Sequence, residues 1–177
     1  MLTTNNTVLF MRLSTQAGFS LIELMTVTII IGIAAGIAIP SLTSFLQTSQ
    51  QKTIQSEFQA AMALARSEAI KRNFPVSVVA NAPVAGNAFG GGWTVWADLN
   101  SNGVIDPGES IRVHAALPTS VTLNGPANIV TFNGKGFLNP LAAVQLKVCP
   151  APPTSRGYLV TIQANGLADV APNTPCP

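Results

Sequence analysis

The sequence predicts an α+β fold in which one long N-terminal helix precedes an antiparallel β-sheet. Residues 19–39 form an almost uninterrupted apolar run, and apolar residues then recur at spacings of three and four up to residue 70, as on one face of a helix. From residue 76 onward the pattern changes to short β-branched and aromatic runs between Asn-Gly and Gly-rich pieces, which is typical of strands joined by turns. A chain of 177 residues suits one modest domain behind such a helix.

The predicted transmembrane segment, residues 19–40, contains this apolar run and is long enough to cross a bilayer, whose hydrocarbon core needs about 20 apolar residues. Glu23 interrupts the run, and a carboxylate inside a membrane costs roughly 2.5 to 3.5 kcal/mol on insertion scales. A secretory signal places its small cleavage residue after the apolar stretch, whereas here Gly18 stands before it. We therefore expect an anchor preceded by a leader, residues 1–18, on the cytoplasmic side.

Residues 41–74 are expected to continue the helix as an amphipathic segment that lays one face on the sheet. Ile54, Phe58, Met62 and Ala65 are among the residues of its apolar stripe. Asn73 and Pro75 predict the end of the helix. The charged group near that end is expected to be solvated, with cations favoured at a helix C-terminus; it consists of Arg66, Glu68, Lys71 and Arg72.

The β domain is expected to comprise residues 75–177. Its predicted strands are 76–80, 93–99, 110–117, 121–123, 128–132, 144–149 and 158–163.

The residues Gly-Phe-Ser-Leu-Ile-Glu at positions 18–23, followed by the apolar run, closely resemble the class III signal of type IV pilins and pseudopilins. This resemblance implies that prepilin peptidase cuts after Gly18 and that the new N-terminus, Phe19, is methylated. It also implies that Glu23 meets the N-terminal amine of a neighbouring subunit in a filament. A paired carboxylate is tolerable in an apolar bundle, so the implied role is physically reasonable. The translation start is open, because Met1 and Met11 both fit.

Residues 63–78 and 91–113 resemble the GspH/FimT family of minor pseudopilins. The family has a pilin-like fold, needs no cofactor, and acts in type II secretion or in type IV pili. The resemblance implies a single-pass protein of the bacterial inner membrane with its C-terminal domain in the periplasm or outside the cell, and later a place in a pilus or pseudopilus. The implied partners are other pilins, prepilin peptidase and the inner-membrane assembly platform.

Residues 98–109 match the spacing of a calcium-binding loop, in which oxygen ligands come from a compact turn. Gly103 stands at the sharp turn, and the flanks resemble strands rather than the two helices of an EF-hand. A hairpin loop rich in Asn and Asp, without metal, fits the same residues. The candidate calcium ligands are Asp98, Asn100, Asn102, Val104, Asp106 and Glu109.

Cys149 and Cys176 are the only cysteines. In an exported domain they are expected to form a disulfide, which would contribute on the order of 3 kcal/mol by pinning the C-terminal segment. Two free thiols are the alternative.

The sequence bears on three classes of function. A structural role in a filament fits the signal best. DNA uptake is the alternative, because some members of the FimT branch bind DNA through a C-terminal Gly-Arg-x-Arg motif; the corresponding residues here are Gly166, Leu167, Ala168 and Asp169, and the net charge is only +2. An enzyme is disfavoured, since His114 is the sole histidine and the sequence offers no organised nucleophile, base and acid.

Overall fold

The computed structural model describes residues 18–152 and 156–176. The chain divides into two compact units, Met1–Ser41 and Leu42–Pro177. Helix α1 (Leu21–Arg72) begins in the first unit and ends in the second. It ends at the predicted place: the amide N–H of Asn73 bonds to the Ile70 carbonyl, and Asn73 has a positive φ of 50°, which closes the helix before Pro75.

In the described residues, eight strands follow α1, and every pairing between them is antiparallel. Seven correspond to the predicted runs, with small differences at their ends. They are β1 (Val76–Ala80), β2 (Trp93–Trp96), β3 (Ser110–His114), β4 (Val121–Asn124), β5 (Ile129–Phe132), β6 (Val144–Pro150) and β7 (Gly157–Ile162).

An eighth strand, β8 (Ala168–Thr174), was not predicted. Its sequence contains Pro172 and Asn173, which ordinarily argue against a strand. The strand forms because it pairs with β7 from Ile162↔Ala168 to Gly157↔Thr174. Since β8 lies at a sheet edge, the missing N–H of Pro172 can be tolerated there.

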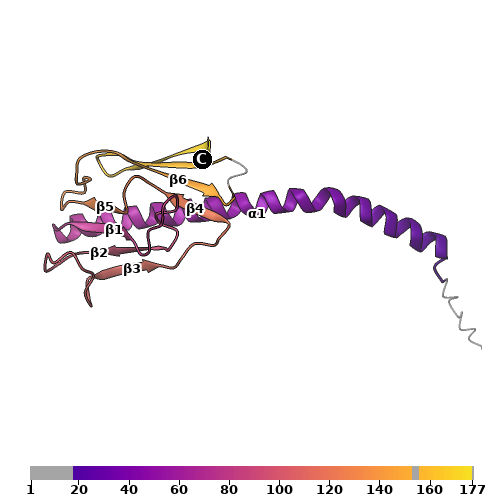
Figure 1. Ribbon diagram of the computed structural model, residues 1–177, viewed down its shortest axis with the longest axis horizontal. Helices are drawn as coiled ribbons and strands as arrows, with labels where there is room; N and C mark the ends of the chain where they lie inside the picture. Colours follow the sequence, from indigo (N-terminus) through magenta and orange to yellow (C-terminus); the bar gives the residue numbers. More distant parts are fainter. Residues whose placement is uncertain (1–17, 153–155, 177) are drawn as a thin grey trace, which may run out of the picture. The chain divides into compact units, whose positions relative to one another are not determined.

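The strands form two four-stranded sheets rather than the single sheet expected (Figure 1). Sheet 1 has the order β3-β2-β1-β5, and sheet 2 has the order β4-β6-β7-β8. The amphipathic stripe of α1 packs on both: Phe58 and Met62 share one core with Val78 of sheet 1 and Leu146 of sheet 2. Phe58 makes edge-on contacts with Phe89 and Trp93, with ring centroids 5.2 Å apart in each case. The stripe therefore stabilises the domain as predicted, although Ile70 lies outside it and is exposed.

Candidate functional site

The apolar first half of α1 is the first candidate region. The large apolar side chains at positions 21–39 are all exposed, and α1 is long and apolar enough to cross a membrane. Ser20 caps its N-terminus, because the Ser20 carbonyl accepts the amide N–H of Leu24 at 3.2 Å and its hydroxyl accepts the amide N–H of Glu23 at 3.3 Å. Such a surface requires lipid or apolar partners around it.

Glu23 lies in the first turn of α1 with its carboxylate exposed. Within residues 18–152 and 156–176 this carboxylate forms no ion pair. Phe19 precedes the helix and is 79% exposed. Gly18 is the first described residue, so the rest of the predicted leader and both candidate start methionines lie outside the described part. Phe19 and Glu23, the two residues that the predicted pairing requires, are thus both exposed in the described part of the chain.

The acidic loop, residues 98–109, is closed by its own hydrogen bonds. The Asp98 carboxylate accepts the amide N–H groups of Asn102 and Gly103 at 3.0 and 2.8 Å. The side-chain amides of Asn100 and Asn102 both donate to Asp106 Oδ2 at 2.7 Å. These contacts use oxygen atoms that a calcium ion would need.

Glu109, the candidate twelfth-position ligand, is 5% exposed. Its Oε1 accepts the amide N–H of Leu99 at 2.9 Å, and its Oε2 accepts the amide N–H of Asp106 at 3.0 Å. The carboxylate therefore tethers both arms of the loop. In the described part of the chain, no three His, Cys, Asp or Glu side chains are grouped so that they could hold a metal ion.

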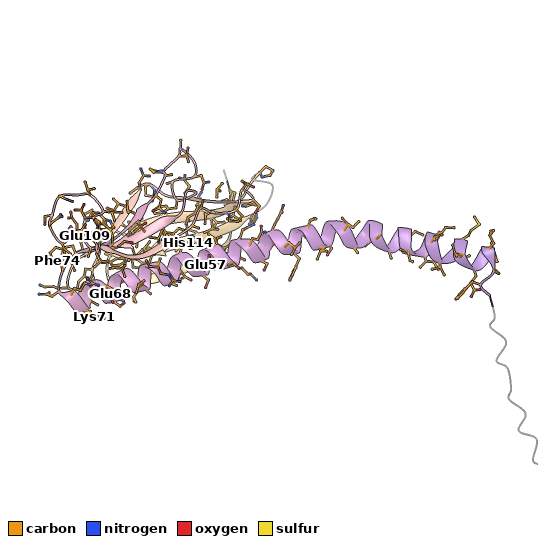
Figure 2. The ribbon with its side chains drawn as sticks, turned by 90° about the horizontal axis from the view of Figure 1, so that it is seen from below. Glu57, Glu68, Lys71, Phe74, Glu109 and His114 are labelled. Atoms are coloured by element: carbon orange, nitrogen blue, oxygen red, sulfur yellow. A yellow bond between two sulfur atoms is a disulfide. The ribbon has the colours of Figure 1, made fainter. Side chains whose placement is uncertain are left out.

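His114 contacts neighbours on both of its ring nitrogens. Nε2 lies 2.9 Å from Glu57 Oε2 and Nδ1 lies 2.7 Å from the Ala115 carbonyl oxygen, and Figure 2 shows Glu57 and His114 next to each other. The ring also stacks on Trp93, with centroids 3.8 Å apart. Since both nitrogens are engaged with acceptors, the ring is placed as a structural link and not as a free base.

The charged end of α1 is only partly the solvated group that the sequence predicts. Glu68 accepts hydrogen bonds from Arg72 Nε at 2.8 Å and from Lys71 Nζ at 3.5 Å. The Arg72 guanidinium lowers the pKa of the Glu68 carboxyl below its ordinary value; desolvation opposes this effect, and Lys71 adds to it. Arg66 differs, because its Nε donates to the Gly136 carbonyl at 3.1 Å. Because Gly136 lies 70 positions from Arg66 in the sequence, the spacing of residues along the helix could not predict this contact.

The turn that would carry the DNA-binding motif joins β7 to β8. Gly166 has a φ of 80° and its amide N–H bonds to the Gln163 carbonyl at 2.7 Å. The next residue, Leu167, is an exposed apolar side chain, and Asp169 places an exposed acid beyond it. This turn therefore offers no cation to a phosphate.

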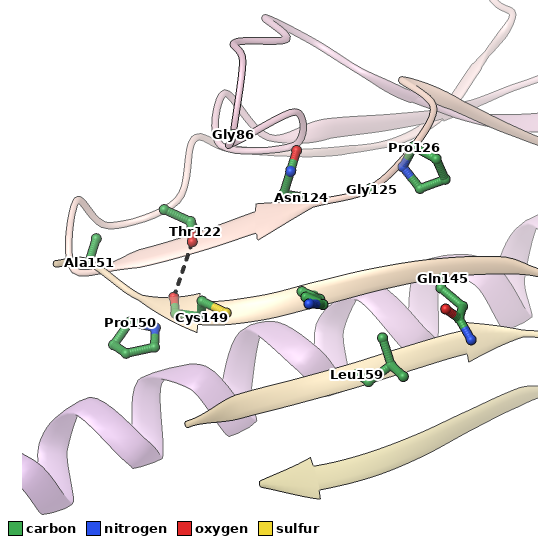
Figure 3. Close-up of a pocket in the computed structure, with 11 residues that line it drawn as sticks. Gly86, Thr122, Asn124, Gly125, Pro126, Gln145, Cys149, Pro150, Ala151 and Leu159 are labelled. Atoms are coloured by element: carbon green, nitrogen blue, oxygen red, sulfur yellow. Dashed lines mark hydrogen bonds between the residues drawn. The ribbon is translucent and has the colours of Figure 1, made fainter. Parts of the chain in front are cut away.

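A groove of about 600 Å³ lies on the face of sheet 2 that points away from α1 (Figure 3). Asn124 and Gln145 supply amides, Pro126 and Leu159 supply apolar surface, and Lys147 is the one charged side chain among the described lining residues. Cys149 also lines the groove and is joined to Cys176 by the predicted disulfide, with Cα atoms 5.8 Å apart. The lining holds no acid–base pair that would suit catalysis.

Two protein-family descriptions match this chain. The family described as type II transport protein GspH matches residues 55–166, and the prokaryotic N-terminal methylation motif matches residues 13–39. The chain belongs to the GspH family. No curated protein gave a significant sequence match.

Solved structures of minor pilins and pseudopilins share the fold of this GspH-family chain. The minor pilin FimU of Pseudomonas aeruginosa PAO1 is 23% identical, with a TM-score of 0.58 over 71% of this chain and 96% of FimU. A second crystal form of FimU is 21% identical, with a TM-score of 0.59 over 75% of this chain and 96% of FimU. The minor pseudopilin EpsH of the Vibrio cholerae type 2 secretion system is 16% identical, with a TM-score of 0.54 over 70% of this chain and 97% of EpsH. At these identities the likeness concerns the fold alone.

The GspH match contains the acidic loop and His114 and ends at Gly166 within the β7–β8 turn, while the methylation motif contains Gly18, Phe19 and Glu23. An N-terminal apolar helix with this motif indicates membrane anchoring of a globular C-terminal domain. The matched family is described as a type II transport protein, and the solved neighbours are a minor pilin and a minor pseudopilin.

Proposed function

We propose that this GspH-family chain is a minor pilin or pseudopilin that prepilin peptidase cuts after Gly18 and that is methylated on Phe19. It is then added, through the first half of α1, to a type II secretion pseudopilus or a type IV pilus. The observation that carries this proposal is the exposed apolar surface at positions 21–39 together with one carboxylate, Glu23. A permanent anchor needs the apolar surface but gains nothing from the acid.

Glu23 acts in assembly by pairing with the amine of a neighbouring Phe19. Cleavage after Gly18 creates that amine, so the partner exists only in the processed subunit. A carboxylate transferred into an apolar bundle without a partner is strongly unfavourable, and the ion pair removes this cost. Processing therefore precedes stable incorporation.

Before assembly, the subunit is inserted in the inner membrane with its C-terminal domain in the periplasm. In the membrane it interacts with the assembly platform and with other pilins. A disulfide fits this compartment, because thiols outside the cytoplasm are oxidised. Methylation of Phe19 leaves the amine able to carry charge, so it is compatible with the pairing.

The test replaces Glu23 in the full chain, expressed in cells that assemble the filament. Glu23→Ala should lose its leader as the wild type does, as measured by the mass of the mature chain. Its content in sheared filaments should fall at least about tenfold, since removing one partner of a buried ion pair costs about 3–5 kcal/mol.

Thr28→Ala is the matched control, because Thr28 is an exposed polar residue in the same run whose hydroxyl bonds to the Met25 carbonyl of its own helix. It should be cut and assembled normally. Normal assembly of Glu23→Ala would refute the pairing, whereas an uncut wild-type chain would refute the proposed processing.

A further inference from the structure

A second groove, here called the Arg66 groove, lies between α1 and the turn that joins β7 to β8. It has a volume of about 290 Å³, and the residues that matter for its chemistry are Met62, Arg66, Ile70, Gly166 and Leu167. All of them belong to the unit Leu42–Pro177.

The Arg66 side chain is held in place by two glycine turns. Its Nε donates to the Gly136 carbonyl at 3.1 Å. A Cβ atom on Gly166 would lie 2.4 Å from the Gly136 oxygen and 2.9 Å from Arg66 Nε, so only glycine allows this approach. The half-buried guanidinium is therefore ordered before any partner arrives, which lowers the entropy cost of binding.

The terminal nitrogens of Arg66 have unused hydrogen-bonding capacity. A guanidinium carries five N–H donors, and the bond to Gly136 is the one that Arg66 makes within the described residues. The nearby acid Glu68 is engaged with Lys71 and Arg72. Among the residues that the structure describes, no acid therefore pairs with the Arg66 guanidinium at the groove.

The groove is flanked by apolar side chains that the fold leaves exposed. Ile70 on α1 is 50% exposed and Leu167 on the β7–β8 turn is 55% exposed. A single exposed apolar residue is common on protein surfaces, but these two line the same groove as the unpaired cation. The combination fits a ligand with both an acid and an apolar group.

We propose that the Arg66 groove receives a segment of a neighbouring filament subunit that presents one carboxylate beside an apolar side chain. The carboxylate accepts two hydrogen bonds from the terminal nitrogens of Arg66, the geometry that a guanidinium favours. The apolar side chain packs between Ile70 and Leu167. This inference rests on the proposed function, because the occupant belongs to the same filament. A nucleic acid is a poorer occupant, since one cation between apolar walls does not follow a phosphate backbone.

The experiment uses the full chain in cells that assemble the filament, with a photo-crosslinking amino acid at Ser67, an exposed lining residue. Crosslinked products are taken from sheared filaments, and the captured peptide is sequenced by mass spectrometry. It should come from another filament subunit and contain an Asp or Glu close to the crosslinked position. Arg66→Gln should lower the crosslink yield roughly tenfold, because the loss of one charge-assisted hydrogen bond weakens binding by about that factor.

Three further variants keep the test independent of folding. Leu167→Asn alters the apolar wall and should also lower the yield, while Leu99→Asn should not; Leu99 is likewise 55% exposed but lies in the acidic loop. Arg66→Lys keeps the charge but loses the fork, and should give an intermediate yield. Retention of the Cys149–Cys176 disulfide on a non-reducing gel checks that each variant is folded.

The outcomes separate this inference from the proposed function. A wild-type chain that is missing from sheared filaments overturns the proposed function. A chain that is present, with a crosslink yield unchanged by Arg66→Gln and Leu167→Asn, overturns the groove alone. So does a captured peptide without an acidic residue.

Discussion

Glu57 Oε2 lies 2.9 Å from His114 Nε2, and this contact joins α1 to β3, an edge strand of sheet 1. The His114 ring is stacked on Trp93 at an interplanar angle of 11°. Nδ1 of the same ring lies 2.7 Å from the Ala115 carbonyl oxygen, so each ring nitrogen has an oxygen atom within hydrogen-bonding distance. The pair links an edge strand of sheet 1 to α1.

Removing this link is expected to weaken the domain measurably. His114→Ala should lower the free energy of unfolding by about 1–2 kcal/mol, because it removes a ring stack and a partly exposed hydrogen bond. A double-mutant cycle with Glu57→Gln should give a coupling of about 0.5–1 kcal/mol, modest because the Glu57 side chain is 45% exposed. Both values are measured by chemical denaturation of the full chain in detergent.

Val113→Ala is the matched control for that cycle. Val113 precedes His114 on β3 and is 63% exposed, so the free energy of unfolding should change by no more than about 0.5 kcal/mol. A cycle with no coupling would show that the contact is incidental.

Glu109→Gln is expected to destabilise the acidic loop, because both carboxylate oxygens accept backbone N–H groups. The amide can accept at one oxygen but turns a donor toward the other N–H, which costs about 1–3 kcal/mol at a buried site. Asp169→Asn is the comparison, since Asp169 is an exposed acid at the start of β8. Equal stability of the two variants would contradict the tethering role of Glu109.

Calcium is expected to leave the melting temperature of the full chain unchanged up to about 1 mM, the range in which weak extracellular sites bind. The reason is that the Asp98 and Glu109 oxygens, and the Asp106 oxygen that both asparagine amides contact, already have partners within the loop. The measurement is thermal unfolding with added calcium after dialysis against a chelator. A rise in melting temperature that Asp98→Asn abolishes would restore the calcium site.

The elements of the fold could be predicted because their signals are local. The apolar stripe that buries Phe58, and the seven predicted strands, follow from the period of neighbouring residues. The strand pairing into two sheets and the existence of β8 could not be predicted, since they depend on partners distant in sequence.

The candidate sites divide in the same way. The proposed processing residues Gly18 and Phe19 and the proposed assembly residue Glu23 lie in one short motif and could be proposed directly from it. The partner of Arg66 is 70 positions away and that of His114 is 57 positions away, so no spacing rule could find them. The loop at residues 98–109 shows a further limit, because the same residues fit calcium ligation and internal hydrogen bonding, and only the atomic contacts distinguish the two.

Glu68 should make stability depend on pH in the acidic range. Its pKa in the folded chain is lowered from an ordinary value of 4.5, so the folded state holds the proton less tightly than the unfolded state does. The stabilisation is therefore fully present above about pH 5 and is lost as the pH falls through the lowered pKa. The melting temperature of Glu68→Gln should lie below that of the wild type at neutral pH and approach it below pH 4.5. A constant difference across this range would assign the effect to packing.

The disulfide is expected to stabilise β8 in particular. Cys149 lies in β6 and Cys176 follows β8, while β8 itself has mostly exposed side chains and Val170 as its one residue packed against the core in the described structure. The double variant Cys149→Ser and Cys176→Ser should lose about 3 kcal/mol of stability, because the unfolded chain is no longer constrained. Limited proteolysis of the full chain in detergent should then cut within β8 first, whereas α1 and sheet 1 remain protected. If cleavage in β8 were as slow in the variant as in the wild type, pairing with β7 alone would suffice to hold the strand.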